Sequence, residues 1–232
     1  MRKPLTLAAA ALALALPLYG PAQETGGDIP RMPDGRPDLR GIWQTMGSAV
    51  WNLEDHTAEL GIPAGQSVIK GGQIPYLPSA LVQREQNYAN RLSEDPEANC
   101  YMVGVPRITY MPYPFQVMQT PEQITFLYEY THTFRNARID SEHPLGPIQW
   151  WMGDSRGHWE GDTFVVDVVH FTDQTWLDRS GNYHSSELHV VEFDPGSIHS
   201  ADLPQVLASE QETAESKKYR RENQEHDHRD QH

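Results

Sequence analysis

Three side chains that can handle protons and anions lie close together in the chain. Glu129, His132 and Arg135 fall within seven residues. A histidine beside a carboxylate can act as a general acid or base near neutral pH, and a nearby arginine can hold an anionic substrate. In an extended strand Glu129 and Arg135 share one face and His132 the other, unless the chain bends at Thr131. The alternative is a buried salt-bridge network inside a β-barrel.

Asp167 is a further candidate, because it interrupts the apolar run Phe164–Val169. A carboxylate in a buried strand must be paired or protonated. It therefore either bonds the backbone of a turn or serves as an acid of tuned pKa in a pocket. His170 follows just beyond, on the opposite strand face. The candidate catalytic residues are Glu129, His132, Asp167 and His184.

Metal and nucleophile chemistry is less well supported. His184, Glu187, His189 and Glu192 can all ligate metals, but strand alternation puts Glu187 and His189 on one face and the other two on the opposite face. No His-Glu-x-x-His or His-x-His spacing occurs among these four residues, so we expect no metal site and no cofactor. Residues 153–157 match Gly-x-Ser-x-Gly, but a turn and a strand follow instead of a helix, which indicates a chance match.

Aromatic residues accompany these groups. Such side chains either line a pocket for an apolar or aromatic ligand or form plain core. The larger set comprises Trp150, Trp151, Trp159, Trp176, Tyr128 and Tyr130. The candidate substrate-binding residues are Arg135, Tyr128, Tyr130, Trp159 and Trp176.

Short segments rich in aromatic and β-branched residues must position these groups. Turn residues separate them at Thr120–Glu122 and at Glu160–Asp162. The pattern predicts a mainly β fold, an antiparallel barrel or sandwich. The opening Gly41-Ile42-Trp43 is similar to the start of lipocalin-type barrels. Strands are expected at 41–44, 107–111, 115–119, 123–130, 133–139, 158–159, 163–171 and 188–193.

One helix is expected in the N-terminal half, over residues 79–94. Ser79 can cap its N-terminus, and Asp95-Pro96 ends it. One apolar face of this helix is marked by Leu81, Val82, Ala89 and Leu92. Residues 47–78, rich in Gly and Pro, are expected to form a long loop, a kind of segment that often carries function.

The two ends of the chain differ from the middle. Arg2-Lys3, the uncharged run Leu5–Leu18 and Gly20-Pro21-Ala22 are typical of a secretory signal peptide, and the run is shorter than the about 20 residues that cross a bilayer. We therefore expect a periplasmic or secreted protein with no membrane span after cleavage. The predicted organisation is a signal peptide (1–22), an extended arm (23–40), one mainly β domain (41–196) and a polar, disordered tail (197–232).

Charge and cysteine content exclude several classes of protein. The formal net charge is −14, and loss of Arg2 and Lys3 would make it more negative. Such a chain does not suit nucleic acid or an anionic membrane surface. One cysteine excludes an internal disulfide framework. The expected partner is a small-molecule ligand, and the oligomeric state is left open.

Three motifs carry a resemblance to a known family. They are PDGRPDLRGIW at 33–43, WEGDTFVVD at 159–167 and TWLD at 175–178. With them, most of residues 31–192 resembles an uncharacterised family of secreted bacterial proteins. The resemblance implies no particular activity. It does imply further strands and a second cysteine after Glu192, where this chain instead diverges or is truncated.

These observations support two functional hypotheses. The first is an exported small-molecule-binding β-barrel with an aromatic-lined pocket. The second is an acid–base enzyme (a lyase, isomerase or hydrolase) that acts on a small apolar or aromatic substrate in the same pocket. A third interpretation, a truncated relative without function, follows from the divergent C-terminus.

Overall fold

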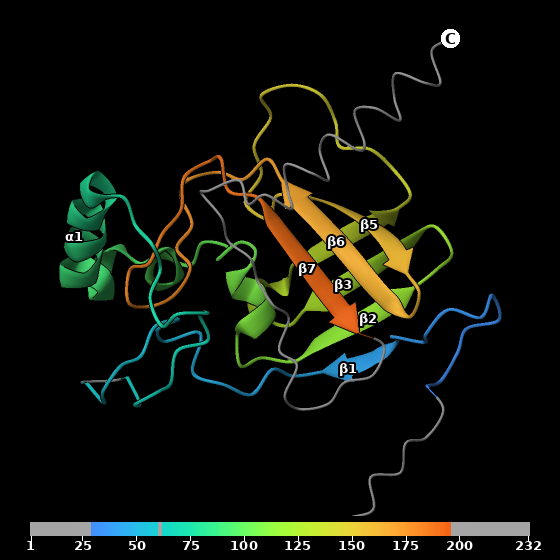
Figure 1. The fold of residues 1–232 in the computed structure, drawn as a ribbon, viewed down its shortest axis with the longest axis horizontal. Helices are drawn as coiled ribbons and strands as arrows, with labels where there is room; N and C mark the ends of the chain where they lie inside the picture. Colours follow the sequence, from blue (N-terminus) through green and yellow to red (C-terminus); the bar gives the residue numbers. More distant parts are fainter. Residues whose placement is uncertain (1–28, 60–61, 196–232) are drawn as a thin grey trace, which may run out of the picture.

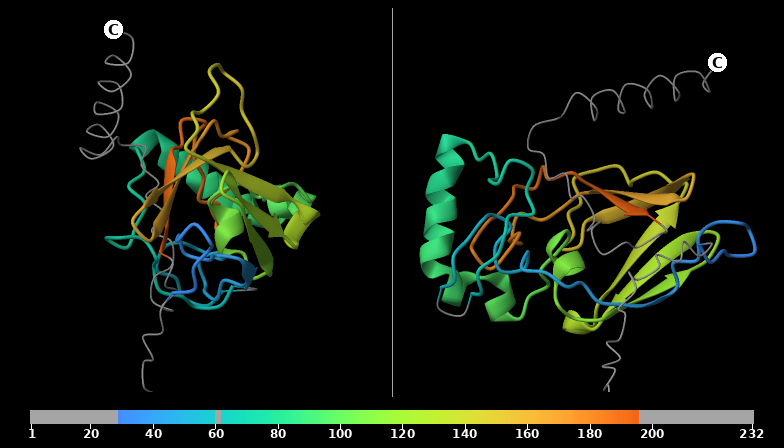
Figure 2. Two further views of the ribbon diagram at one scale, coloured as in Figure 1. Left: turned by 90° about the vertical axis from the view of Figure 1, so that its right-hand side faces the viewer. Right: turned by 60° about the horizontal axis from the view of Figure 1, so that its bottom comes forward.

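The computed structural model describes residues 29–59 and 62–195. The predicted signal peptide, the first residues of the arm and the polar tail lie outside these ranges. The predicted fold class is confirmed, because the chain forms a mainly β structure with a single α-helix. Its seven strands form a curled sheet, a half-barrel, seen from three directions in Figures 1 and 2.

The strands lie in the sheet in the order of the sequence. They are β1 (Gly41–Trp43), β2 (Phe115–Gln119), β3 (Gln123–Tyr128), β4 (Phe134–Ile139), β5 (Asp154–Glu160), β6 (Thr163–Val169) and β7 (Val190–Pro195). Neighbours pair antiparallel except β4 and β5, which are parallel with Ala137 opposite Ser155. The β4–β5 pair therefore departs from the antiparallel pairing that we expected. Parallel strands need a crossover connection, and residues 140–153 provide it.

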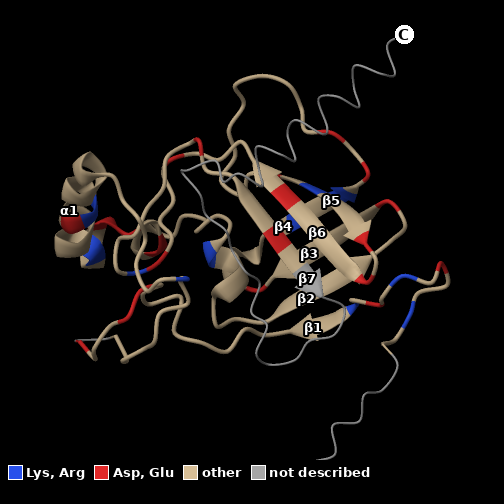
Figure 3. Ribbon diagram, in the orientation of Figure 1, with Lys and Arg blue, Asp and Glu red and all other residues tan. Residues whose placement is uncertain are grey.

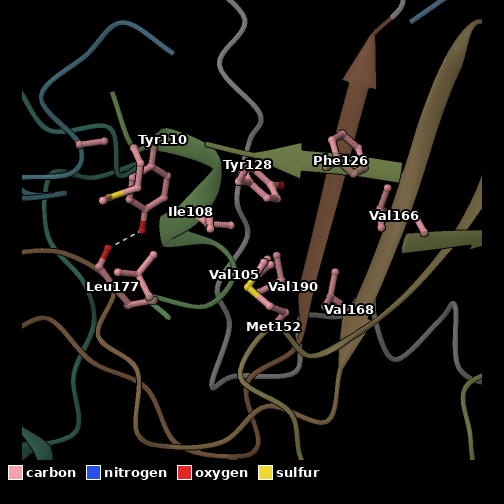
Figure 4. Packing of buried hydrophobic residues seen from close by; sticks show 14 of the residues in the cluster. Val105, Ile108, Tyr110, Phe126, Tyr128, Met152, Val166, Val168, Leu177 and Val190 are labelled. Atoms are coloured by element: carbon pink, nitrogen blue, oxygen red, sulfur yellow. Dashed lines mark hydrogen bonds between the residues drawn. The ribbon is translucent and has the colours of Figure 1, made fainter. Parts of the chain in front are cut away.

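The concave face of the sheet is filled by hydrophobic side chains. Phe126 of β3, Val166 of β6 and Val190 of β7 belong to one buried cluster. Figure 4 shows this packing, together with Val105 and Ile108 from the segment before β2. Burial of such apolar surface is the main stabilising term of the fold.

The segment at 107–111 is not the strand that we expected. It forms the 3₁₀ helix η2 (Arg107–Tyr110), which follows a second 3₁₀ helix, η1 (Pro96–Asn99). Arg107 is fully buried, and its guanidinium bonds both Asp95 and Glu97. A segment this short has no periodicity that separates a strand from a buried helical turn.

The helix α1 (Pro78–Glu94) lies at one end of the molecule, away from the sheet, in Figures 1 and 2. The helix itself is confirmed, but its N-cap is Leu77, without a side-chain cap bond, instead of Ser79. The predicted apolar face is exposed instead of packed against the core, since Leu81, Val82 and Leu92 are 44%, 56% and 80% exposed. The buried residue is Asn87, which donates to the Gly181 carbonyl.

The described part of the arm, residues 29–40, is attached to the sheet by side-chain hydrogen bonds. Arg31 forms a bidentate ion pair with Asp162, which lies in the turn between β5 and β6. Gln119 of β2 accepts from the Leu39 N–H and donates to the Pro37 carbonyl. Among the described residues, no helix has the length and apolar character needed to cross a membrane.

Candidate functional site

The first predicted group, Glu129, His132 and Arg135, is not assembled as one site. Thr131 and His132 both adopt positive φ angles, so the chain bends between β3 and β4 where strand alternation would break. Glu129 and His132 are exposed on this bend. Their one described contact is a backbone bond from the His132 N–H to the Glu129 carbonyl, 3.2 Å long.

Arg135 lies instead within the buried interior. Its Nε donates to the Ser155 hydroxyl at 2.7 Å, and its Nη2 bonds the Glu192 carboxylate. The arginine and the glutamate are 4% and 7% exposed. A paired guanidinium at this depth acts as a structural ion pair, the alternative that the sequence left open. Ser155, the serine of the Gly-x-Ser-x-Gly match, is buried in β5 and not on a strand-to-helix turn.

Asp167 lies at the centre of a different cluster, on the face of β5, β6 and β7 that points away from the hydrophobic core. It is the only acidic residue of β6 and gives that strand its red segment in Figure 3. Arg156 of β5 is directly opposite Asp167 in the strand register, and Asp154 is two residues before Arg156. His189 lies directly before β7, and His143 is on the connection between β4 and β5.

These five side chains form a continuous chain of hydrogen bonds, which we call the Asp167 cluster (His143, Asp154, Arg156, Asp167 and His189). His143 contacts Asp154 through Nδ1 at 2.7 Å and Asp167 through Nε2 at 2.8 Å. The other Asp167 oxygen is 2.5 Å from Nε2 of His189. Arg156 holds Asp154 by two bonds, of 2.6 and 2.9 Å.

The electrostatics of the Asp167 cluster follow from this geometry. Burial alone would raise the pKa of Asp167, but hydrogen bonds from His143 and His189 outweigh it and hold the pKa at about 2. Burial likewise opposes the charge on Asp154, yet bonds from Arg156 and His143 lower its pKa. For His143, the two carboxylates outweigh desolvation and raise the pKa. Both carboxylates are therefore ionised at neutral pH.

Aromatic side chains border the cluster on one side. The His170 ring lies edge-on to His143, with ring centres 6.2 Å apart, and Trp150 lies edge-on to His170 at 5.8 Å. Nε2 of His170 donates to the Pro144 carbonyl at 3.0 Å. Trp150, at 37% exposed, is the accessible aromatic next to these imidazoles.

The remaining predicted residues lie elsewhere in the fold. His184 is buried, and its ring nitrogens contact the Thr175 hydroxyl and the Ser185 carbonyl. Tyr128 is buried against Phe115. Tyr130 stacks on Tyr113, and Trp159 packs against Phe164. Trp176 is buried, and its backbone forms an isolated β-bridge with Tyr183.

The segment from His184 to Glu192 contains four side chains of types that can ligate metals. Glu192 points inward to Arg135 while His189 points outward to Asp167, so strand alternation separates them as expected. Among the residues described, no group of three or more His, Cys, Asp or Glu side chains is arranged to hold a metal ion.

Comparisons of the chain with known protein families, curated proteins and solved structures find no match. Sequence reasoning found Asp167 but missed its partners His143, Asp154 and Arg156. The alternation Asp154, Arg156, His158 in front of Glu160-Gly161-Asp162 is a signal that could have extended β5 and placed all three on one face. His143 lies in a loop, where no periodic pattern exists to place it.

Proposed function

We propose that the protein is an exported acid–base enzyme in which His189, oriented by Asp167, transfers the proton. The observation that carries this proposal is the 2.5 Å contact between Nε2 of His189 and the Asp167 carboxylate. A carboxylate in this position keeps the proton on Nε2 and leaves the lone pair on Nδ1. Nδ1 makes no hydrogen bond within residues 29–59 and 62–195, and the side chain is 20% exposed.

The chemistry that this arrangement supports is proton abstraction from a bound substrate or from a water molecule. Nδ1 of His189 accepts the proton, and the ionised Asp167 stabilises the imidazolium that results. His143 and Arg156 balance the charges of Asp167 and Asp154, which favours an uncharged substrate. The nearby Trp150 ring suits an apolar or aromatic one. A lyase, isomerase or hydrolase reaction fits these requirements.

The proposal is tested by turnover of small uncharged aryl compounds, with p-nitrophenyl acetate as the first probe. His189→Gln should lower the rate by about 10²–10⁴-fold, the usual contribution of a general base. His158→Gln is the matched control, because His158 lies on the same sheet face but bonds Glu160 instead of Asp167. Turnover that His189→Gln leaves at the wild-type rate would contradict this role for His189.

Ligand binding beside Trp159 is a second candidate, and one observation favours it. Trp159 points to the concave side, and its Nε1–H is buried without an acceptor among the described residues. A buried unpaired donor is costly, and a ligand acceptor would satisfy it. Trp159→Phe should then abolish saturable binding of N-phenyl-1-naphthylamine, an uncharged aromatic probe, while Trp51→Phe should not. Equal binding by both variants would remove this candidate.

A further inference from the structure

Beyond catalysis, His143 is placed to control the connection on which it lies. Residues 140–153 cross from the end of β4 to the start of β5, and this connection is the loop at the top of Figure 1. Beyond His143 and Pro144 the connection extends into solvent, with Leu145 97% and Ile148 52% exposed. Residues 145–149 make no hydrogen bonds within the described part of the chain.

The contacts of His143 require a protonated ring. A neutral imidazole has one N–H and one lone pair, so it can donate to only one acceptor. Here Nδ1 and Nε2 both lie within 2.8 Å of carboxylate oxygens, which accept only. Removal of one proton would turn a donor–carboxylate contact into a repulsion between a lone pair and an anion. When His143 makes both contacts, its ring is therefore in the imidazolium form.

We infer that His143 is a pH-dependent latch, which holds the 140–153 connection against β5 and β6 when protonated and releases it when neutral. The latch also covers one oxygen of Asp167, so release uncovers part of the cluster. Other contacts keep the base of the connection in place during release. Asp140 N–H bonds the Gly157 carbonyl, and Arg156 donates to the Ser141 hydroxyl.

Seven charged or titratable side chains lie around His143. Asp154 and Asp167 are its acceptors. Arg156 bonds Asp154, so His143 is the only cation on Asp167 Oδ1 among the described residues. The others are His189 on the far oxygen of Asp167, His170 edge-on to the ring and bonded to Pro144, and the exposed Asp140 and Glu142 on the connection itself.

Amide hydrogen exchange at Trp150 and Thr172 in the full chain tests the latch, because the Trp150 N–H bonds the His170 carbonyl and the Thr172 N–H bonds the Trp150 carbonyl. Because opening releases one proton, the protection factor should fall by up to about tenfold per pH unit above the ordinary histidine pKa. His143→Gln should show low protection that does not change with pH. His158→Gln should behave as wild type.

Two outcomes would overturn the latch. One is a wild-type protection factor that is the same at about pH 6 and about pH 9, across the range where histidine loses its proton. The other is a His143→Gln variant with the wild-type pH dependence. Because the wild-type series and His158→Gln decide the first outcome, the inference remains testable even if His143→Gln fails to fold. Neither measurement involves turnover, so failure of the latch is distinct from failure of the proposed enzyme.

Discussion

At the scale of single residues, the main feature of the outer face of the sheet is the Asp167 carboxylate, which lies between the imidazoles of His143 and His189. The apolar run around Asp167 already indicated that this carboxylate needs a partner. The sequence left open whether Asp167 bonds a turn backbone or is an acid of tuned pKa in a pocket, because its two histidine partners come from the 140–153 connection and from the residue before β7. Local sequence carries no information on such long-range contacts.

The depressed pKa of Asp167 predicts a loss of stability in acid. Its pKa falls from an ordinary value of 3.8 to about 2 in the folded protein, so its contribution is complete above about pH 4 and is lost as the pH falls toward 2. Asp167→Asn should lower the free energy of unfolding by about 1–3 kcal/mol at neutral pH. The wild-type and variant curves from urea unfolding should converge as the pH falls. Parallel curves would show that Asp167 is not held in its ionised form.

The Arg135–Glu192 ion pair should act as a structural element. Glu192→Ala leaves a buried arginine unpaired and should cost about 3–5 kcal/mol of unfolding free energy. The double variant Arg135→Met/Glu192→Leu removes both charges and should recover most of that loss. Chemical denaturation of the single and double variants measures the difference. A double variant as unstable as Glu192→Ala would argue that the arginine has a role beyond this pair.

At the scale of elements, strands were easier to predict than faces. Phe115–Gln119 was predicted to the residue, because alternation and the Thr120–Glu122 turn both mark it. The 107–111 segment is a 3₁₀ helix and not a strand, because so short a segment has no periodicity that separates the two. For α1, the pattern shows which residues are apolar, but tertiary contacts decide which side is covered, and α1 contacts its neighbours through Asn87, Tyr88 and Arg91.

The orientation of α1 gives a stability prediction of its own. Leu92→Gln should change the unfolding free energy by no more than about 0.5 kcal/mol, because the side chain is already in water. Asn87→Ala should cost about 1–2 kcal/mol, since it removes the bond to the Gly181 carbonyl. Asn90→Ala, an exposed asparagine of the same helix, is the control. Thermal unfolding should show Asn87→Ala as the least stable of the three variants, with Leu92→Gln and Asn90→Ala close to wild type. A destabilised Leu92→Gln would mean that the apolar side is covered.

At the scale of the whole molecule, the mainly β architecture was predictable and the parallel β4–β5 pair was not. Turn signals mark hairpins well, but no composition signal shows that residues 140–153 cross over instead of turning back. That crossover brings His143 onto the two carboxylates. The main feature of the site thus depends on the part of the topology that the sequence did not predict.

The attachment of the arm can be tested at Gln119. Gln119→Leu leaves the Leu39 N–H and the Pro37 carbonyl without their buried partner, at about 1–3 kcal/mol for each group. Limited proteolysis should then cut within residues 29–40 faster than in wild type. Gln116→Leu, on the exposed face of the same strand, should leave the cleavage rate unchanged. Equal cleavage of wild type and Gln119→Leu would show that Gln119 does not hold the arm.

The protonation states within the Asp167 cluster are the most direct test of the account. Nitrogen-detected NMR of the histidine rings in the intact protein at neutral pH reports which nitrogens carry protons. The account predicts that His143 is protonated on both ring nitrogens and that His189 carries its proton on Nε2, with Nδ1 bare. A neutral His143, or a His189 with its proton on Nδ1, would contradict it.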